Sequence, residues 1–159
     1  MAFPPLFIHE LTHIILSLMA AAATCYLASR EKKQIRRALY LVSFLGALLG
    51  GFFVDVDHLI DYVFAFGLHF DLGNFLSGVM FDKLQKIYVF FHAWEWVILL
   101  GIIAVHVKKP AIRYFLMALM LGLLSHLIYD TIYNHIYFFG YSIIYRIMHN
   151  FDMSAIVLH

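Results

Sequence analysis

The sequence predicts an all-α polytopic membrane protein, built as a single integral membrane domain over residues 1–159. Hydrophobic residues make up 64% of the chain and charged residues only 13%, against about 45–50% and about 25% in a soluble domain. Such a chain has too much apolar surface to stay in water or to be disordered. Its length suits about four spanning helices of ~20 residues. The net charge of +1 argues against nucleic acid as a partner.

Four apolar stretches account for the predicted spans. The first three end where charged residues, or a proline with two lysines, interrupt the apolar run. The connection 59–85 contains no uninterrupted stretch long enough to span, so we expect an interfacial or re-entrant segment there. The tail 138–159 is typical of an amphipathic surface helix more than of a fifth span. The spans are expected over residues 6–28, 38–57, 86–107 and 111–137.

The basic residues predict the orientation of these spans. Eight of the 11 lysines and arginines fall in two short turns, at 30–37 and 108–113. By the positive-inside rule both turns are cytoplasmic, which places both chain ends and the 59–85 connection outside. Of the acidic residues only Glu31 lies with the inner turns. The remaining acids and most histidines are therefore expected on the extracytoplasmic side of the membrane.

Most of the ionisable residues of the spans fall in one slab, roughly 18–28 Å above the cytoplasmic helix ends at the α-helical rise. Ionisable groups inside a membrane are costly unless they face other protein groups. They also occur three or four residues apart, which puts them on one helix face. Inward pairs of this kind build metal centres in helical bundles. The pairs are His9 and His13, Asp55 and His58, Asp57 and Asp61, His92 and Glu95, and His126 and Asp130.

These pairs predict a centre for one or two divalent ions. The single cysteine excludes a thiolate site, and nitrogen and oxygen donors favour Zn²⁺, with Mn²⁺ or Fe²⁺ as alternatives. Asp55 and Glu95 are the expected catalytic residues, as general base or additional ligand. Asp61 and His9 are expected to orient the ligands. The predicted metal ligands are His13, Asp57, His58, His92, His126 and Asp130.

A Gly-rich helix that runs into Asp55-Val56-Asp57-His58, together with an N-terminal His and a late His-x-x-x-Asp element, resembles the predicted membrane-bound metal-dependent hydrolases of bacteria and archaea. The resemblance implies an integral protein of a prokaryotic inner (cytoplasmic) membrane with a divalent metal. One element departs from the family: members often show His-Arg-x-x-x-His where this chain has His92-Ala-Trp-Glu95. The matched positions are His13, Asp55, Asp57, His58, His126 and Asp130.

The predicted activity is hydrolysis of an ester or phosphoester by metal-activated water, on a lipid or another membrane-associated substrate. The sequence leaves the substrate and the oligomeric state open. Three alternatives remain. The segment His9-Glu10-Leu11-Thr12-His13 satisfies H-E-x-x-H, which would suit an intramembrane metalloprotease. Intramembrane His and acidic residues also mark metal-ion or proton transporters. A closed metal site would instead be structural.

Overall fold

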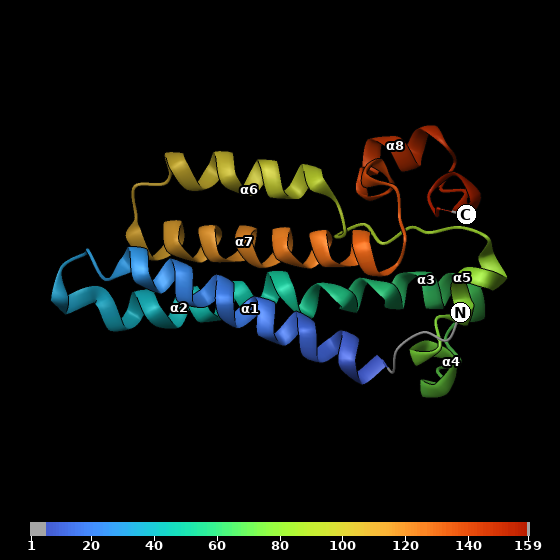
Figure 1. Ribbon diagram of the computed structural model, residues 1–159, viewed down its shortest axis with the longest axis horizontal. Helices are drawn as coiled ribbons and strands as arrows, with labels where there is room; N and C mark the ends of the chain where they lie inside the picture. Colours follow the sequence, from blue (N-terminus) through green and yellow to red (C-terminus); the bar gives the residue numbers. More distant parts are fainter. Residues whose placement is uncertain (1–5, 159) are drawn as a thin grey trace. The chain divides into compact units, whose positions relative to one another are not determined.

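The computed structural model describes residues 6–158 and is all-helical over this range, which confirms the all-α part of the predicted fold class (Figure 1). Two compact units divide the chain: residues up to Val54 with Glu95–Ile128, and Asp55–Trp94 with the residues from Tyr129 onward. The α-helices are α1 (Leu6–Ala28), α2 (Lys33–Gly51), α3 (His58–Phe66), α4 (Leu72–Leu76), α5 (Val79–Leu84), α6 (Trp94–His106), α7 (Pro110–Tyr133) and α8 (Ile143–Met148). The 3-10 helices are η1 (Phe53–Asp57), η2 (Phe138–Tyr141) and η3 (Met153–Ala155).

Two helices, α1 and α7, are long and apolar enough to cross a membrane. A third candidate span arises if α2 and the bent continuation Phe53–Phe66 are taken together. The stretch expected to span from residue 86 is helical only over the 13 residues of α6, which is short for a crossing. Among the described residues the structure thus has two candidate spans, or three with the bent pair, and the four-span arrangement stays a prediction.

In the first unit, small residues bring the backbones of α2 and α7 into direct contact. A Cβ atom at Gly50 would lie 2.2 Å from the carbonyl oxygen of Leu119, and one at Gly122 would lie 2.5 Å from that of Ala47. No larger residue fits without moving a helix, as in other tightly packed membrane helices. The packing extends to α1 through the buried alanines Ala20, Ala21, Ala47 and Ala118.

We expect Gly50→Ala to destabilise the protein by about 1–3 kcal/mol, because the added methyl group collides with backbone and not with a movable side chain. Gly101→Ala is the matched control, since a Cβ there meets only the sulfur of Met120, at 3.1 Å. Thermal unfolding in detergent, followed by circular dichroism, measures both variants. Equal midpoints for the two would contradict the close approach of α2 and α7.

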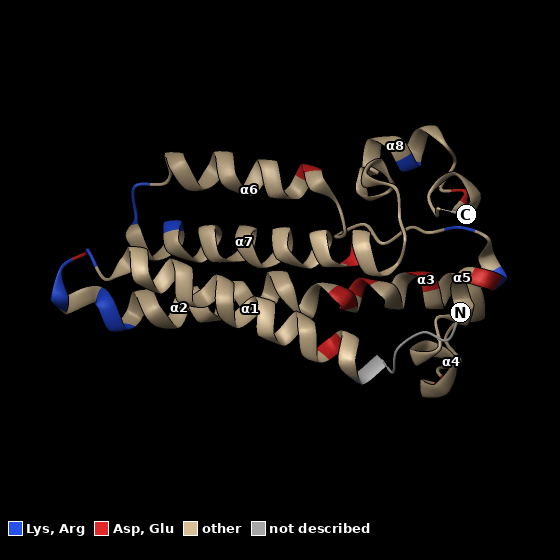
Figure 2. Cartoon of the chain, viewed as in Figure 1, with Lys and Arg blue, Asp and Glu red and all other residues tan. Residues whose placement is uncertain are grey.

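The two basic turns lie at the same end of the first unit (Figure 2). Arg113, at the start of α7, donates a hydrogen bond to the carboxylate of Glu31 in the α1–α2 turn, at 2.8 Å. The hydroxyl of Tyr114 donates to the same carboxylate at 3.1 Å. This arrangement agrees with the prediction that both turns lie on one side of the membrane. Which side they face stays a prediction from the positive-inside rule.

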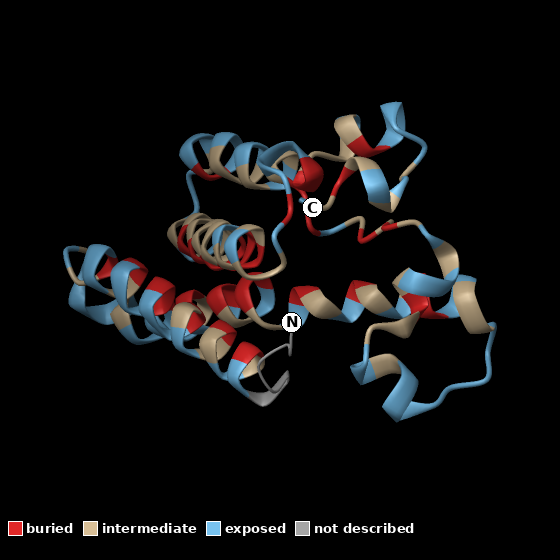
Figure 3. Ribbon diagram, turned by 45° about the vertical axis from the view of Figure 1, so that its right-hand side comes forward, coloured by how far each residue is buried: buried red, intermediate tan, exposed pale blue. Residues whose placement is uncertain are grey.

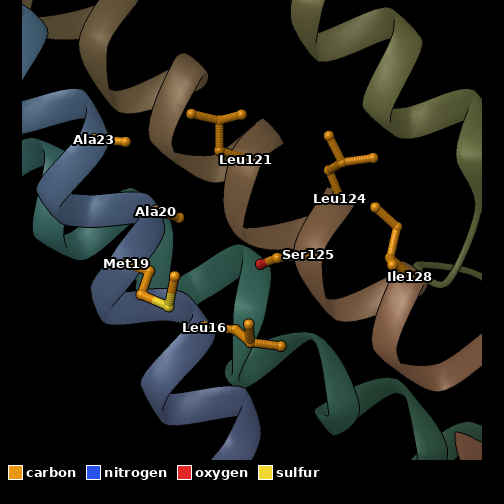
Figure 4. A pocket seen from close by; sticks show the side chains of 8 residues that line it. All are labelled: Leu16, Met19, Ala20, Ala23, Leu121, Leu124, Ser125 and Ile128. Carbon is orange, nitrogen blue, oxygen red and sulfur yellow. The ribbon is translucent and has the colours of Figure 1, made fainter. Parts of the chain in front are cut away.

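Many residues on the helices of the first unit are exposed (pale blue in Figure 3), and a large share of them are apolar. Met19 on α1 is 63% exposed, Leu41 on α2 59% and Val105 on α6 77%. Such a surface is unfavourable in water and suits the hydrocarbon of a bilayer. An open, largely apolar groove of about 240 Å³ runs between α1 and α7 (Figure 4). Both features are compatible with a membrane location.

In the second unit, the predicted interfacial segment 59–85 consists of the short helices α3, α4 and α5. α3 ends before Gly67, whose backbone has a φ of 68° that favours glycine. α4 begins after Asp71, whose carboxylate accepts a hydrogen bond from the backbone N–H of Asn74 at 2.7 Å. This is an N-cap, the usual way to satisfy a free N–H at a helix start.

The tail does not form one amphipathic surface helix. α8 is only six residues long, and its Arg146 is fully buried instead of facing water. Backbone bonds join the tail to the segment before α6: the N–H of Ile87 donates to the oxygen of Phe151, and that of Met153 to the oxygen of Gln85, both at 3.0 Å. The tail is therefore part of the packed second unit.

Candidate metal centre

Asp55, in the short helix between α2 and α3, and His58, the first residue of α3, lie on one side of the chain. Residues 53–57 form the 3-10 helix η1, and residues three apart eclipse one another in that geometry. Accordingly, His58 Nε2 lies 3.2 Å from Asp55 Oδ1. Within the described part of the chain, His58 Nδ1 is buried and has no hydrogen-bond partner. A buried ring nitrogen of this kind is suited to interact with a bound ion or molecule.

His92 stands at the centre of the site, in the irregular segment before α6 and outside the candidate spans. Its side chain is 1% exposed, and both ring nitrogens face carboxylates. Nδ1 lies 3.0 Å from Asp57 Oδ1 and 3.2 Å from Asp57 Oδ2. Nε2 lies 3.1 Å from Asp55 Oδ1 and 3.9 Å from Asp130 Oδ2. One imidazole therefore connects three acidic side chains of the second unit.

These carboxylates give the site a strongly negative character. Burial by itself lowers the pKa of His92, but the carboxylates of Asp57 and Asp55 outweigh it and raise the pKa to about 10. An imidazole that holds a proton so firmly shows how strongly the surroundings favour positive charge. The same surroundings would favour a divalent cation, which has to be bound by paired or charged groups when it is buried.

Two overlapping sets of donors can hold an ion. The ligand atoms of Asp55, His92 and Asp130 lie within 4.8 Å of one another, and so do those of Asp57, His58 and His92. His92 belongs to both sets, so a proton or ion on one ring nitrogen affects the donor role of the other. These residues thus fit a metal ion, because they offer imidazole and carboxylate donors at chelating distance.

The aromatic ring of Tyr141 lies beside that of His92. The two rings are stacked with centroids 6.1 Å apart, and the amide of Asn134 donates to the Tyr141 hydroxyl at 3.4 Å. Burial, with a further contribution from the carboxylate of Asp130, raises the pKa of Tyr141 well above its ordinary value. The hydroxyl therefore stays protonated and can donate a hydrogen bond at neutral pH.

Three other predicted site residues gather in the first unit. His9 Nε2 and His13 Nε2 lie 3.0 Å apart on α1, as the four-residue spacing requires. The ring of His13 stacks on that of His126 at 3.9 Å, and His126 Nδ1 lies 3.0 Å from the carbonyl oxygen of Gly51. Glu95 also belongs to this unit, half-buried in the first turn of α6.

The hydrogen bonds that the structure gives Asp61 go to backbone. Its two oxygens accept hydrogen bonds from the N–H groups of Tyr88 and Val89, at 2.8 and 3.0 Å. The sequence also gave no role to Arg146, which donates to the carbonyl oxygens of three residues in the same segment. The available signal was one arginine within the otherwise apolar stretch Ile143–Met148, because a charge there needs buried partners.

Comparisons of the chain with family models, with curated proteins and with solved structures found no match. The resemblance to membrane-bound metal-dependent hydrolases therefore stays a prediction from the motifs, beside a site whose buried histidine and aspartate side chains could hold a metal ion.

Proposed function

We propose that the protein is a membrane-embedded hydrolase that depends on a divalent metal ion held by Asp55, His92 and Asp130. The observation that supports this most is the position of His92, whose two ring nitrogens face carboxylates on opposite edges of the ring. In this proposal the site is built from residues of the second unit. Its substrates are esters or phosphoesters of lipids or other membrane-associated molecules.

Asp57 orients the His92 ring for metal binding. When Nδ1–H donates to the Asp57 carboxylate, the lone pair of the neutral ring lies on Nε2, toward Asp55 and Asp130. Pairs of carboxylate and histidine in this arrangement fix the ring and make it a better metal ligand. Asp57 also accepts a hydrogen bond from the N–H of Phe91, at 2.7 Å, which keeps its own carboxylate in place. In this account Asp57 orients the ligand and does not bind the ion directly.

Three protein donors leave a coordination position for water or substrate, as catalytic zinc sites do. A divalent ion in such a site lowers the pKa of water and polarises a carbonyl or phosphoryl oxygen. His58, beside Asp55 and with Nδ1 not used by the protein, would accept a proton from the attacking water. The neutral hydroxyl of Tyr141 would donate to a developing negative charge.

A membrane-associated substrate suits a chain that has candidate membrane spans. Two helices are suited to span a bilayer, and exposed apolar side chains also occur in the second unit, for example Leu68 at 92% and Met148 at 77%. Such residues favour contact with the membrane surface. A substrate already held in that layer reaches the protein without leaving it.

Metal content and activity of the same preparation test the proposal. We expect protein purified without chelators to contain zinc, manganese or iron in stoichiometric amount, and we expect Asp130→Asn to lower that content while Asp82→Asn, an exposed acid on α5, does not. Vesicles containing the protein should hydrolyse phospholipid or ester substrates in a chelator-sensitive way. Metal flux without hydrolysis would support a transporter instead. A tightly held ion with neither activity would support a structural metal.

A further inference from the structure

The segment that carries His92 has no regular hydrogen-bonding pattern of its own. Between the end of α5 and the start of α6 the chain is irregular, although Ile87, Val89, His92 and Ala93 are buried. Buried backbone N–H and C=O groups without partners are costly. Side chains from elsewhere in the second unit must therefore provide the partners.

Two oppositely charged side chains provide them. Arg146 of α8 donates to the carbonyl oxygens of Tyr88, Val89 and His92, at 2.5, 2.9 and 2.7 Å. Asp61 of α3 accepts from the N–H groups of Tyr88 and Val89. Both side chains are fully buried, so these charge-assisted bonds take the place of hydration that each charge has lost.

Val89 is held in a conformation that its side chain disfavours. Its φ is 28°, which is unusual for any residue with a Cβ atom and most of all for a β-branched one. Strain of this kind persists only where surrounding groups fix the backbone. Here Asp61 holds the N–H of Val89 and Arg146 holds its carbonyl oxygen. The same oxygen accepts from the N–H of His92 at 3.0 Å, which links the strained residue to the proposed ligand.

We propose that Arg146 is a positioning residue of the metal centre, acting with Asp61 to hold the strained segment 88–92 so that His92 faces its carboxylates. The metal-binding part of this inference rests on the proposed function, whereas the clamp on the segment does not. The C-terminal tail thereby becomes part of the site, since α8 supplies the arginine, and Phe151 and Met153, which follow α8, make backbone bonds to Ile87 and Gln85 that hold this part of the tail beside the segment.

Substitution of Arg146 separates this role from general stability. Arg146→Lys keeps a positive charge but has fewer donors and lacks the planar fork that reaches three oxygens. We expect its affinity for Co²⁺ to fall about tenfold or more, as is typical when a group that supports a metal ligand is changed. The visible absorption of bound Co²⁺ should also change, because the position of His92 is altered. Arg146→Met should be more severe. Arg113→Met, which removes an arginine paired with Glu31 in the first unit, should leave affinity and spectrum unchanged.

Amide hydrogen exchange of the metal-free protein tests independently whether Arg146 holds residues 88–92. We expect the amides of residues 88–92 to exchange faster in Arg146→Lys, while those of α1 and α2 keep their protection. Unchanged exchange in 88–92 would overturn the clamp. Faster exchange with wild-type Co²⁺ affinity and spectrum would overturn its role in metal binding. If the wild-type protein binds no Co²⁺, the proposed function fails, and the exchange measurement still decides whether Arg146 holds the segment.

Discussion

Replacing His92 with alanine is expected to remove the bound metal and abolish metal-dependent hydrolysis. The substitution deletes the nitrogen that faces Asp55 and Asp130 and leaves three carboxylates without the imidazole between them. His92→Gln tests the same point with less risk to folding, since its amide can still donate to Asp57 but offers no imidazole nitrogen to an ion. Elemental analysis and chelator-sensitive hydrolysis measure the result.

His69→Ala is the matched control for His92. It removes a histidine of the same unit that is exposed on the surface, and it should keep both metal and activity. A size-exclusion elution profile like that of the wild type and an unchanged helical circular dichroism spectrum show that each variant is folded. Wild-type metal content in folded His92→Gln would remove this residue from the metal site.

Asp57→Asn is expected to weaken metal binding by about 10–100-fold without abolishing it. The one oxygen of an asparagine can still accept from the N–H of Phe91 and from His92 Nδ1, since both lie against Asp57 Oδ2. The substitution instead puts an NH₂ group in place of Oδ1, which lies 3.0 Å from His92 Nδ1. It also removes the negative charge that makes the imidazole a stronger donor. Competition with a chelator of known affinity measures the loss.

The size of this loss decides between two roles for Asp57. The sequence motifs favour it as a direct ligand, and the geometry favours it as the residue that orients His92. Loss as complete as in the His92 variants would make Asp57 a direct ligand. Affinity equal to that of Asp82→Asn, the exposed control, would leave it without either role.

The all-α fold and much of the candidate site could be predicted from local spacing. Asp55 and His58 are three residues apart, and both a 3-10 and an α-helical path put them on one side of the chain. His9 and His13 meet for the same reason. Apolar composition was enough to predict α1 and α7 as candidate spans, because helices are the usual way to satisfy backbone groups in hydrocarbon.

The segment before α6 could not be predicted in this way. Its apolar run, Ile87, Tyr88, Val89, Phe90 and Phe91, predicts the start of a span, yet helix begins only at Trp94. Aromatic and β-branched residues have only modest helix propensity, and here Asp57, Asp61 and Arg146 provide the bonds that a helix would otherwise make. Those partners lie about 27 to 58 residues away in sequence, where periodicity carries no information.

An anomalous-scattering map at the absorption edge of the metal found by elemental analysis tests the central claim most directly. We predict a peak within bonding distance of His92 Nε2, about 2.0–2.1 Å if the metal is zinc, with oxygens of Asp55 and Asp130 as further ligands and Asp57 on the opposite ring nitrogen. A crystal of metal-containing protein whose anomalous peaks all lie away from His92 would contradict the account.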